Sequence, residues 1–153
     1  MTSNHMDANS ALMKRANYMS NIVPQASTFN QGIWLDAENI AECYRDIAPV
    51  RVVGGVVYDD EANDYFLSSH GIRTPDYFWK TILTTDRASG ETKTISWYIP
   101  NSNFVSDLDS YIVSIRELEE LVGISRVGIN ATERVGTMKP FQSWRLPSQC
   151  NFG

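Results

Sequence analysis

The feature that most constrains the fold of this chain is an apolar repeat with the period of an α-helix. From Asn30 onward, apolar residues recur at three- and four-residue steps, at Ile33, Ala37, Ile40, Ala41, Tyr44 and Ile47. This spacing predicts one helix that begins at Asn30, where an N-cap belongs, and stops at Pro49, because proline cannot continue a helix. We expect the rest of the chain to form a scaffold around this helix.

The segments after this helix have β-strand patterns. Residues 51–58 read R-V-V-G-G-V-V-Y, a buried strand whose Gly54-Gly55 pair indicates a bulge or a close approach to another backbone. A second strand leads through residues 81–84, and a third spans residues 92–99. The turn sequence at residues 86–90 lies between them and predicts a hairpin.

A short strand at residues 111–113 is followed by a helix with clear start and stop signals. Ser114 and Glu117 form a capping-box pattern, and Gly123 ends the helix. The chain after Ile124 reads mostly as loop. These elements predict an α+β fold in which helices flank a mainly antiparallel sheet, built as one domain over residues 1–153.

Composition narrows the class of protein. The chain has 153 residues, of which 42% are hydrophobic and 20% charged, and this is ordinary for a soluble globular protein. No window is apolar enough for a membrane helix, no signal-peptide pattern opens the chain, and we expect no membrane partner. The net charge of -5 gives no general reason to expect nucleic acid. A divalent cation and a few arginines can still neutralise a phosphate locally.

The two cysteines, Cys43 and Cys150, are far apart and do not have zinc-site spacing. Cys43 lies at an apolar-type position of the predicted helix, so a buried free thiol is favoured. A disulfide to Cys150 is the alternative in a secreted protein, and the sequon at Asn130 fits that compartment.

The entrance to the long helix, residues 17–44, is rich in amides. Three asparagines and two glutamines lie near the helix start, and amides are costly to bury unless they are hydrogen-bonded or bind an ion. Asn30, Trp34 and Glu38 follow one another at four-residue steps, which predicts a shared side of the helix. We therefore expect the functional site here.

The same residues resemble the core motif of a known enzyme family. The matching segments are N-Y-M-S-N-I from Asn17, Pro24-Gln25, N-Q-G-I-W from Asn30, and Glu38. This pattern resembles the DNA/RNA non-specific endonucleases, which are the ββα-metal or His-Me finger nucleases that include endonuclease G. Weaker likeness continues to about Ile124.

The resemblance implies a site and a reaction. Asn30 would coordinate a single divalent ion, usually Mg²⁺ or another such as Mn²⁺, with water filling most other positions. Glu38 would hold the ion's water shell, and Asn21 would help to position the site. The implied reaction is metal-dependent hydrolysis of phosphodiester bonds in DNA or RNA without strong sequence preference. The resemblance also implies a secreted or mitochondrial location and is compatible with a homodimer.

Each of these residues also has an ordinary structural interpretation. An isolated asparagine at the position of Asn30 is a helix cap, and Asn21 alone is a turn residue. Glu38 alone is a solvated helix residue, and Trp34 is a core anchor rather than a base-stacking platform. The surrounding motif favours the metal-ligand role for Asn30.

The sequence also departs from the family pattern. The family takes its general base from a D-R-G-H motif, which is absent here, and the alignment places this motif just before Met1. The chain thus reads as the C-terminal larger part of such a domain, truncated at its N-terminus, and we expect little or no nuclease activity from it alone. The resemblance places His5 several residues past the catalytic position, which disfavours it as the base without excluding it, and His70 lies far along the chain in the loop before Pro75.

A second departure is Glu42, where the family often has arginine, and Arg45 one turn later is a candidate to replace it. The alternative function is a non-catalytic, truncated relative that binds nucleic acid or a protein.

Overall fold

The computed structural model describes residues 22–59, 73–148 and 150, and shows an α+β fold. The helices and strands, in chain order, are α2 (Ser27–Gln31), α3 (Ile33–Ile47), β1 (Val50–Val57), β2 (Tyr77–Thr85), β3 (Thr92–Pro100), the 3₁₀ helix η5 (Leu108–Tyr111), β4 (Ile112–Val113), α4 (Ile115–Val122), α5 (Ile124–Val127) and α6 (Glu133–Gly136). The strands form an antiparallel sheet in the order β1-β2-β3-β4. The predicted fold class is confirmed.

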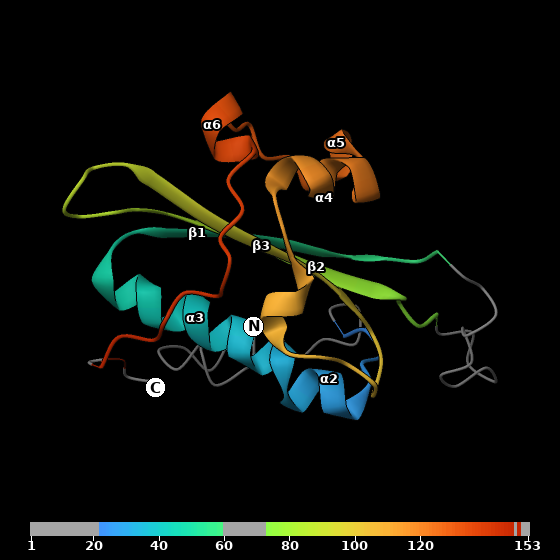
Figure 1. Ribbon diagram of the computed structural model, residues 1–153. Coiled ribbons are helices and arrows are strands. Elements are labelled where there is room, and N and C mark those ends of the chain that lie inside the picture. Colours follow the sequence, from blue (N-terminus) through green and yellow to red (C-terminus); the bar gives the residue numbers. More distant parts are fainter. Residues whose placement is uncertain (1–21, 60–72, 149, 151–153) are drawn as a thin grey trace, which may run out of the picture.

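The sheet separates two layers of helices (Figure 1): α2 and α3 lie on one side, and α4, α5 and α6 lie on the other. Each face of the sheet has its own core. On the α3 side the buried residues are Phe29, Ile33, Trp34, Ala37, Ile40, Phe78, Ile82, Ile95, Trp97, Ile99, Leu108 and Ile112. On the other side they are Val57, Trp79, Ile115, Leu118, Val122, Val127, Ile129 and Val135. The alternation of strand residues between two apolar layers explains why β2 and β3 are buried along most of their length.

The start of the long helix differs from the prediction. Helix α3 begins at Ile33, and Asn30 lies inside the preceding helix α2, so the prediction that Asn30 is the N-cap is wrong. The chain breaks at Gly32, whose amide donates to the carbonyl of Thr28 at 3.0 Å. A β-carbon at Gly32 would lie 2.7 Å from that carbonyl oxygen, so a side chain does not fit this turn. The apolar repeat cannot reveal such a break because it continues across it.

The Gly54-Gly55 pair in β1 serves a close approach, not a bulge. The register with β2 runs without interruption from Val50 opposite Thr84 to Val57 opposite Tyr77. A β-carbon on Gly55 would lie 2.8 Å from the indole nitrogen of Trp79, and one on Gly54 would lie 3.0 Å from the Trp79 carbonyl. The bulge is therefore wrong, and the close-approach alternative is confirmed.

The other local predictions hold in most respects. The β2–β3 hairpin is confirmed, and in the capping box the Ser114 amide donates to Glu117 at 2.7 Å while the Glu117 amide donates to the Ser114 hydroxyl at 3.1 Å. Helix α4 ends at Gly123, whose φ is 99°. The segment after Ile124 is not all loop, since α5 and α6 are helices too short to show a periodic pattern.

No helix in the described ranges has the length and apolar character needed to cross a bilayer.

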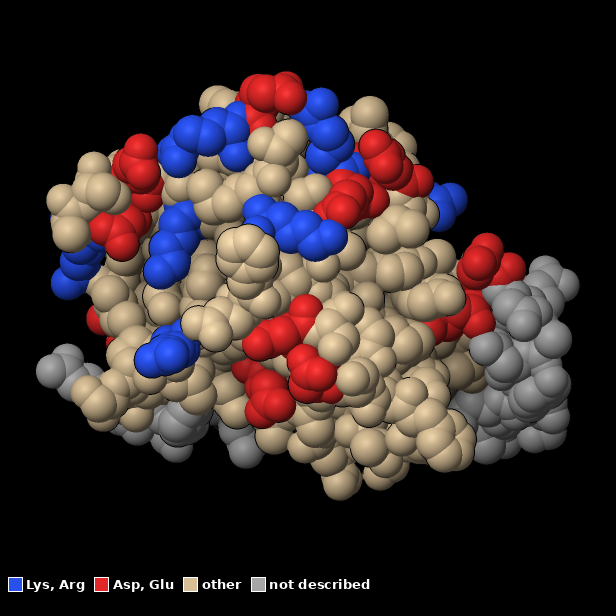
Figure 2. Space-filling model, viewed as in Figure 1, with Lys and Arg blue, Asp and Glu red and all other residues tan. Residues whose placement is uncertain are grey.

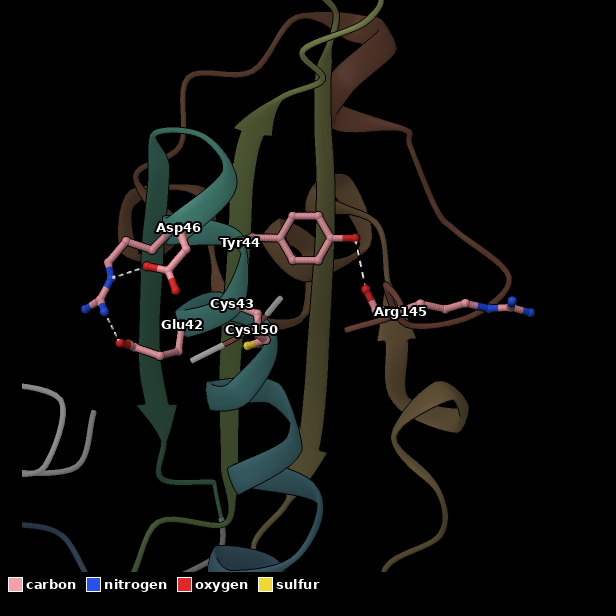
Figure 3. The surroundings of a disulfide bond; sticks show 7 residues. Glu42, Cys43, Tyr44, Asp46, Arg145 and Cys150 are labelled. Carbon is pink, nitrogen blue, oxygen red and sulfur yellow. Dashed lines mark hydrogen bonds and ion pairs between the residues drawn. A yellow bond between two sulfur atoms is a disulfide. The ribbon is translucent and has the colours of Figure 1, made fainter. Parts of the chain in front are cut away.

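A disulfide joins Cys43 of α3 to Cys150 (Figure 3). Cys43 is buried, but the preferred prediction of a free thiol is wrong. The C-terminal segment returns beside α3, where the Tyr44 and Trp144 rings pack with centroids 4.8 Å apart. The Tyr44 hydroxyl also donates to the Arg145 carbonyl at 3.2 Å. This return brings together cysteines that are 107 residues apart, which the sequence pattern cannot show.

Candidate functional site

Glu38 and Trp34 of α3 meet Lys80 of β2 between the helix and the sheet. Glu38 is buried, and its Oε1 lies 3.8 Å from the Nζ of Lys80, which is also buried. The same Nζ lies 3.9 Å from the ring centroid of Trp34, one helical turn before Glu38. The shared side predicted for Trp34 and Glu38 is therefore confirmed, and Glu38 is not the solvated residue that an isolated glutamate would suggest. Trp34 is buried, as expected of a core anchor.

Lys80 is a candidate site residue that the sequence reasoning missed. Strand β2 places it on the α3 face, opposite Gly54 of β1 and Trp97 of β3. Gly54 has no side chain, and the fully buried Trp97 is uncharged. Neither neighbour therefore provides a negative charge that would pair with the ammonium group. A lysine inside the run Y-F-W-K-T-I-L was the available signal, because lysine is almost never fully buried unless it is paired.

Burial governs the protonation of Lys80. Loss of solvent lowers the pKa of its ammonium group to about 8 from 10.5, although the nearby Glu38 carboxylate raises it. A partly compensated cation inside an apolar layer is costly for stability. Its presence here marks the pair with Glu38 as a candidate functional feature.

Asn30 lies at the surface, near the end of α2. Its side chain is exposed, and within the described part of the chain no hydrogen bond to that side chain is present. Its backbone amide donates to the Ala26 carbonyl at 2.9 Å. Because the chain breaks at Gly32, Asn30 does not continue the helical row of Trp34 and Glu38, and the shared side predicted for all three residues holds only for the last two.

The segment that leads into α2 is held by two asparagines that the sequence reasoning also missed. Asn101 accepts from the Ala26 amide at 2.7 Å and donates to the carbonyls of Pro24 and Pro75 at 3.1 and 2.9 Å. Asn103 accepts from the Thr28 amide at 2.9 Å. These bonds fix the amide-rich entrance to the end of β3. The N-S-N sequence after Pro100 reads only as a turn, so its partners 75 residues away were not predictable.

The other predicted residues lie on α3 or outside the described residues. Asn21, His5 and His70 lie outside the described residues. Glu42 is buried and forms an ion pair with Arg45, which also lies 3.7 Å from Asp46. In Figure 3, Glu42 and Tyr44 leave α3 on different sides. The two carboxylates lie beside the half-exposed Arg45, whose role in place of the family's arginine stays a prediction.

The donor chemistry of these residues suits a hydrated divalent ion. Mg²⁺ prefers oxygen ligands and keeps several waters, so it does not need a cage of protein side chains. Asn30 provides an exposed amide oxygen, and Glu38 provides a carboxylate. In the described ranges no group of three or more histidine, cysteine or acidic side chains could hold a metal by itself. The donor types of Asn30 and Glu38 are those of an ion that is bound mainly through water.

In Figure 2, basic and acidic side chains alternate over the α4–α6 layer, and several acidic side chains lie together below it, near the middle of the face. Arg116 and Glu133 are bonded at 2.7 Å, and Lys139 and Glu117 at 2.8 Å. Such exposed pairs contribute little to stability. They also leave this face without the basic field that would attract a polyanion over a distance.

The stability contribution of Lys80 is expected to depend on pH. The pKa in the folded protein, about 8, lies below the ordinary 10.5, so between these values the unfolded chain binds more protons and stability rises with pH. The wild type should gain about 2 to 3 kcal/mol of unfolding free energy by pH 10, relative to pH 7. Urea unfolding should be compared with that of the Glu38→Gln/Lys80→Met double variant, which lacks both groups. An equal pH dependence in the two proteins would contradict this expectation.

Comparison with known proteins identifies the family of this chain. The family model for DNA/RNA non-specific endonucleases matches residues 1–132. The chain is also similar to a nuclease of Serratia marcescens, with 27% identity over 111 residues, which cover 71% of this chain and 42% of that relative. The chain thus spans less than half the length of this curated relative. Because the family match includes both Asn30 and Glu38 and most of the chain, this protein belongs to the DNA/RNA non-specific endonuclease family.

Proposed function

We propose that this protein contributes a metal site to the hydrolysis of phosphodiester bonds in DNA or RNA, without strong sequence preference. The observation that carries the proposal is the family match across residues 1–132, which includes the exposed amide of Asn30 and the buried carboxylate of Glu38. A bound Mg²⁺ or Mn²⁺ would stabilise negative charge on the scissile phosphate and the leaving oxygen.

Each residue has a distinct part in this proposal. Asn30 provides its amide oxygen as the protein ligand, and the anchoring of α2 by Phe29 and by the Asn101 and Asn103 bonds supports a defined position for it. Glu38 accepts hydrogen bonds from the water around the ion, a role that suits a carboxylate held by Lys80. Asn21 helps to position the site.

The general base is a separate matter. Residues 1–153 contain no D-R-G-H motif, and Arg45 is already paired with two carboxylates. We therefore expect the 153-residue chain to bind the ion but to cleave nucleic acid slowly or not at all. The same observation favours a second function, in which a non-catalytic relative binds nucleic acid or a protein. The disulfide supports a secreted location over a reducing compartment.

The test of the metal site is direct binding of Mn²⁺, followed by the electron paramagnetic resonance signal of the free ion. Asn30→Ala should weaken binding by about 100-fold or more, since loss of a ligand costs at least as much as loss of an outer-shell partner. The matched control is Asn130→Ala, which removes an exposed asparagine on the loop between α5 and α6. Equal affinity in the wild type and Asn30→Ala would refute the proposed ligand.

Plasmid nicking measured in the same samples separates the functions. Mn²⁺ binding without nicking agrees with a site that lacks its base. Nicking that is lost in Asn30→Ala would show that the base is present, and His5 would be the next residue to replace. Absence of Mn²⁺ binding, together with retained binding of nucleic acid or a protein, would favour the non-catalytic function.

A further inference from the structure

The ion pair between Lys80 and Glu38 is unusual for its surroundings. Both side chains are buried on the α3 side of the sheet, beside the apolar core of that layer. A buried pair of this kind is a weak source of stability, because the cost of removing two charges from water offsets their attraction. The lowered pKa of Lys80 agrees with that cost. Packing alone therefore gives no reason for a lysine at this position.

The ammonium group of Lys80 lies against an aromatic ring. Trp34 covers it at 3.9 Å from the ring centroid, and the strand neighbours Trp97 and Gly54 flank its backbone position on either side. The glycine cannot be replaced without a contact, since a β-carbon there would lie 3.0 Å from the Trp79 carbonyl. Lys80 thus approaches Glu38 from a rigid strand and not from a mobile loop.

We propose that Lys80 is a positioning residue of the metal site, and that it holds the Glu38 carboxylate in the orientation that accepts hydrogen bonds from the ion's water shell. The contact is between Lys80 Nζ and Glu38 Oε1 at 3.8 Å. A carboxylate has about four acceptor positions on two oxygens, so one ammonium contact is compatible with further hydrogen bonds to water. This inference rests on the proposed function, since it assigns Lys80 to the metal site proposed for Asn30 and Glu38.

The test is a double-mutant cycle on Mn²⁺ affinity, with the wild type, Lys80→Met, Glu38→Gln and the double variant. Lys80→Met should weaken Mn²⁺ binding about 10- to 100-fold, as expected for loss of an outer-shell partner. If Lys80 acts through Glu38, then Lys80→Met should have little further effect in the Glu38→Gln background. A purely structural role of Lys80 would give additive losses instead.

Two further measurements keep the test decisive. Lys80→Arg retains a cation and should recover most of the affinity lost in Lys80→Met, which also covers the case in which the methionine variant folds poorly. Urea unfolding without metal should show that the double variant is destabilised less than the sum of the two single variants. Each single variant leaves one member of the buried pair without its partner, and the double variant does not. Additive unfolding effects would overturn the assignment of the pair.

The outcomes also distinguish this inference from the proposed function. If the wild type binds Mn²⁺ through Asn30 and Lys80→Met leaves the affinity unchanged or tighter, only the role of Lys80 is overturned. If the wild type does not bind Mn²⁺, the proposed metal site fails and the positioning role fails with it. Non-additive changes in Mn²⁺ affinity, together with recovered affinity in Lys80→Arg, would support both the metal site and the positioning role of Lys80.

Discussion

Reduction of the Cys43–Cys150 disulfide is expected to lower the free energy of unfolding by about 4 to 5 kcal/mol. The bond joins residues 107 positions apart, so it restricts most of the unfolded chain. In the chain-entropy description, closing a loop of about 100 residues is worth about 4.7 kcal/mol at 25 °C. Urea unfolding with and without dithiothreitol, followed by tryptophan fluorescence, measures the difference.

The control is the Cys43→Ala/Cys150→Ala double variant, whose stability should not respond to dithiothreitol. Its midpoint should lie near that of the reduced wild type, apart from the small change in packing at the buried Cys43. A disulfide contribution below about 1 kcal/mol would contradict this expectation, because it would mean that the C-terminal segment leaves α3 when the bond is reduced, despite the contact of Tyr44 with Trp144.

Replacement of Phe29 by alanine is expected to cost about 3 to 5 kcal/mol, the range for loss of a buried aromatic side chain. Phe29 is fully buried, and its ring centroid lies 5.4 Å from that of Trp34 and 5.0 Å from that of Phe78. It is also the residue before Asn30. Loss of this anchor should therefore weaken Mn²⁺ binding as well, because the position of α2 against the core is less well defined.

Phe104→Ala is the matched control, since the same side chain is 95% exposed there. Its effect on urea stability should stay within about 0.5 kcal/mol, as for most surface substitutions. Equal destabilisation by the two changes would contradict the buried position of Phe29. Unchanged Mn²⁺ affinity in a folded Phe29→Ala protein would show that α2 does not depend on this contact to present Asn30.

The elements that could be predicted from the sequence are those whose signals are local. The apolar repeat of α3, the hairpin around residues 86–90 and the capping box of Ser114 and Glu117 each depend on residues a few positions apart. The start of α3 was misplaced by the same logic. An apolar repeat indicates which side chains face the core. It does not show the close contact of Gly32 with the Thr28 carbonyl, at which α2 ends.

The residues around the candidate site show the same limit of local signals. The motif predicts roles for Asn30 and Glu38, and the structure adds the contacts of Lys80 with Glu38 and Trp34. Lys80 comes from another layer, 42 positions later in the numbering, so no spacing rule connects it to Glu38. The anchoring of α2 by Asn101 and Asn103 depends in the same way on where the end of β3 lies in space.

The sequence by itself determined the fold class, the order of most elements and the family, because periodicity, caps and short motifs act over a few residues. Only the tertiary structure decided that Glu38 is a buried ion-pair partner, that Asn30 is exposed on a separate short helix, and that Cys43 is bonded to Cys150. The physical reason is the same in each case. Burial, ion pairing and disulfide formation depend on distances between segments that meet only when the two helical layers pack on the sheet.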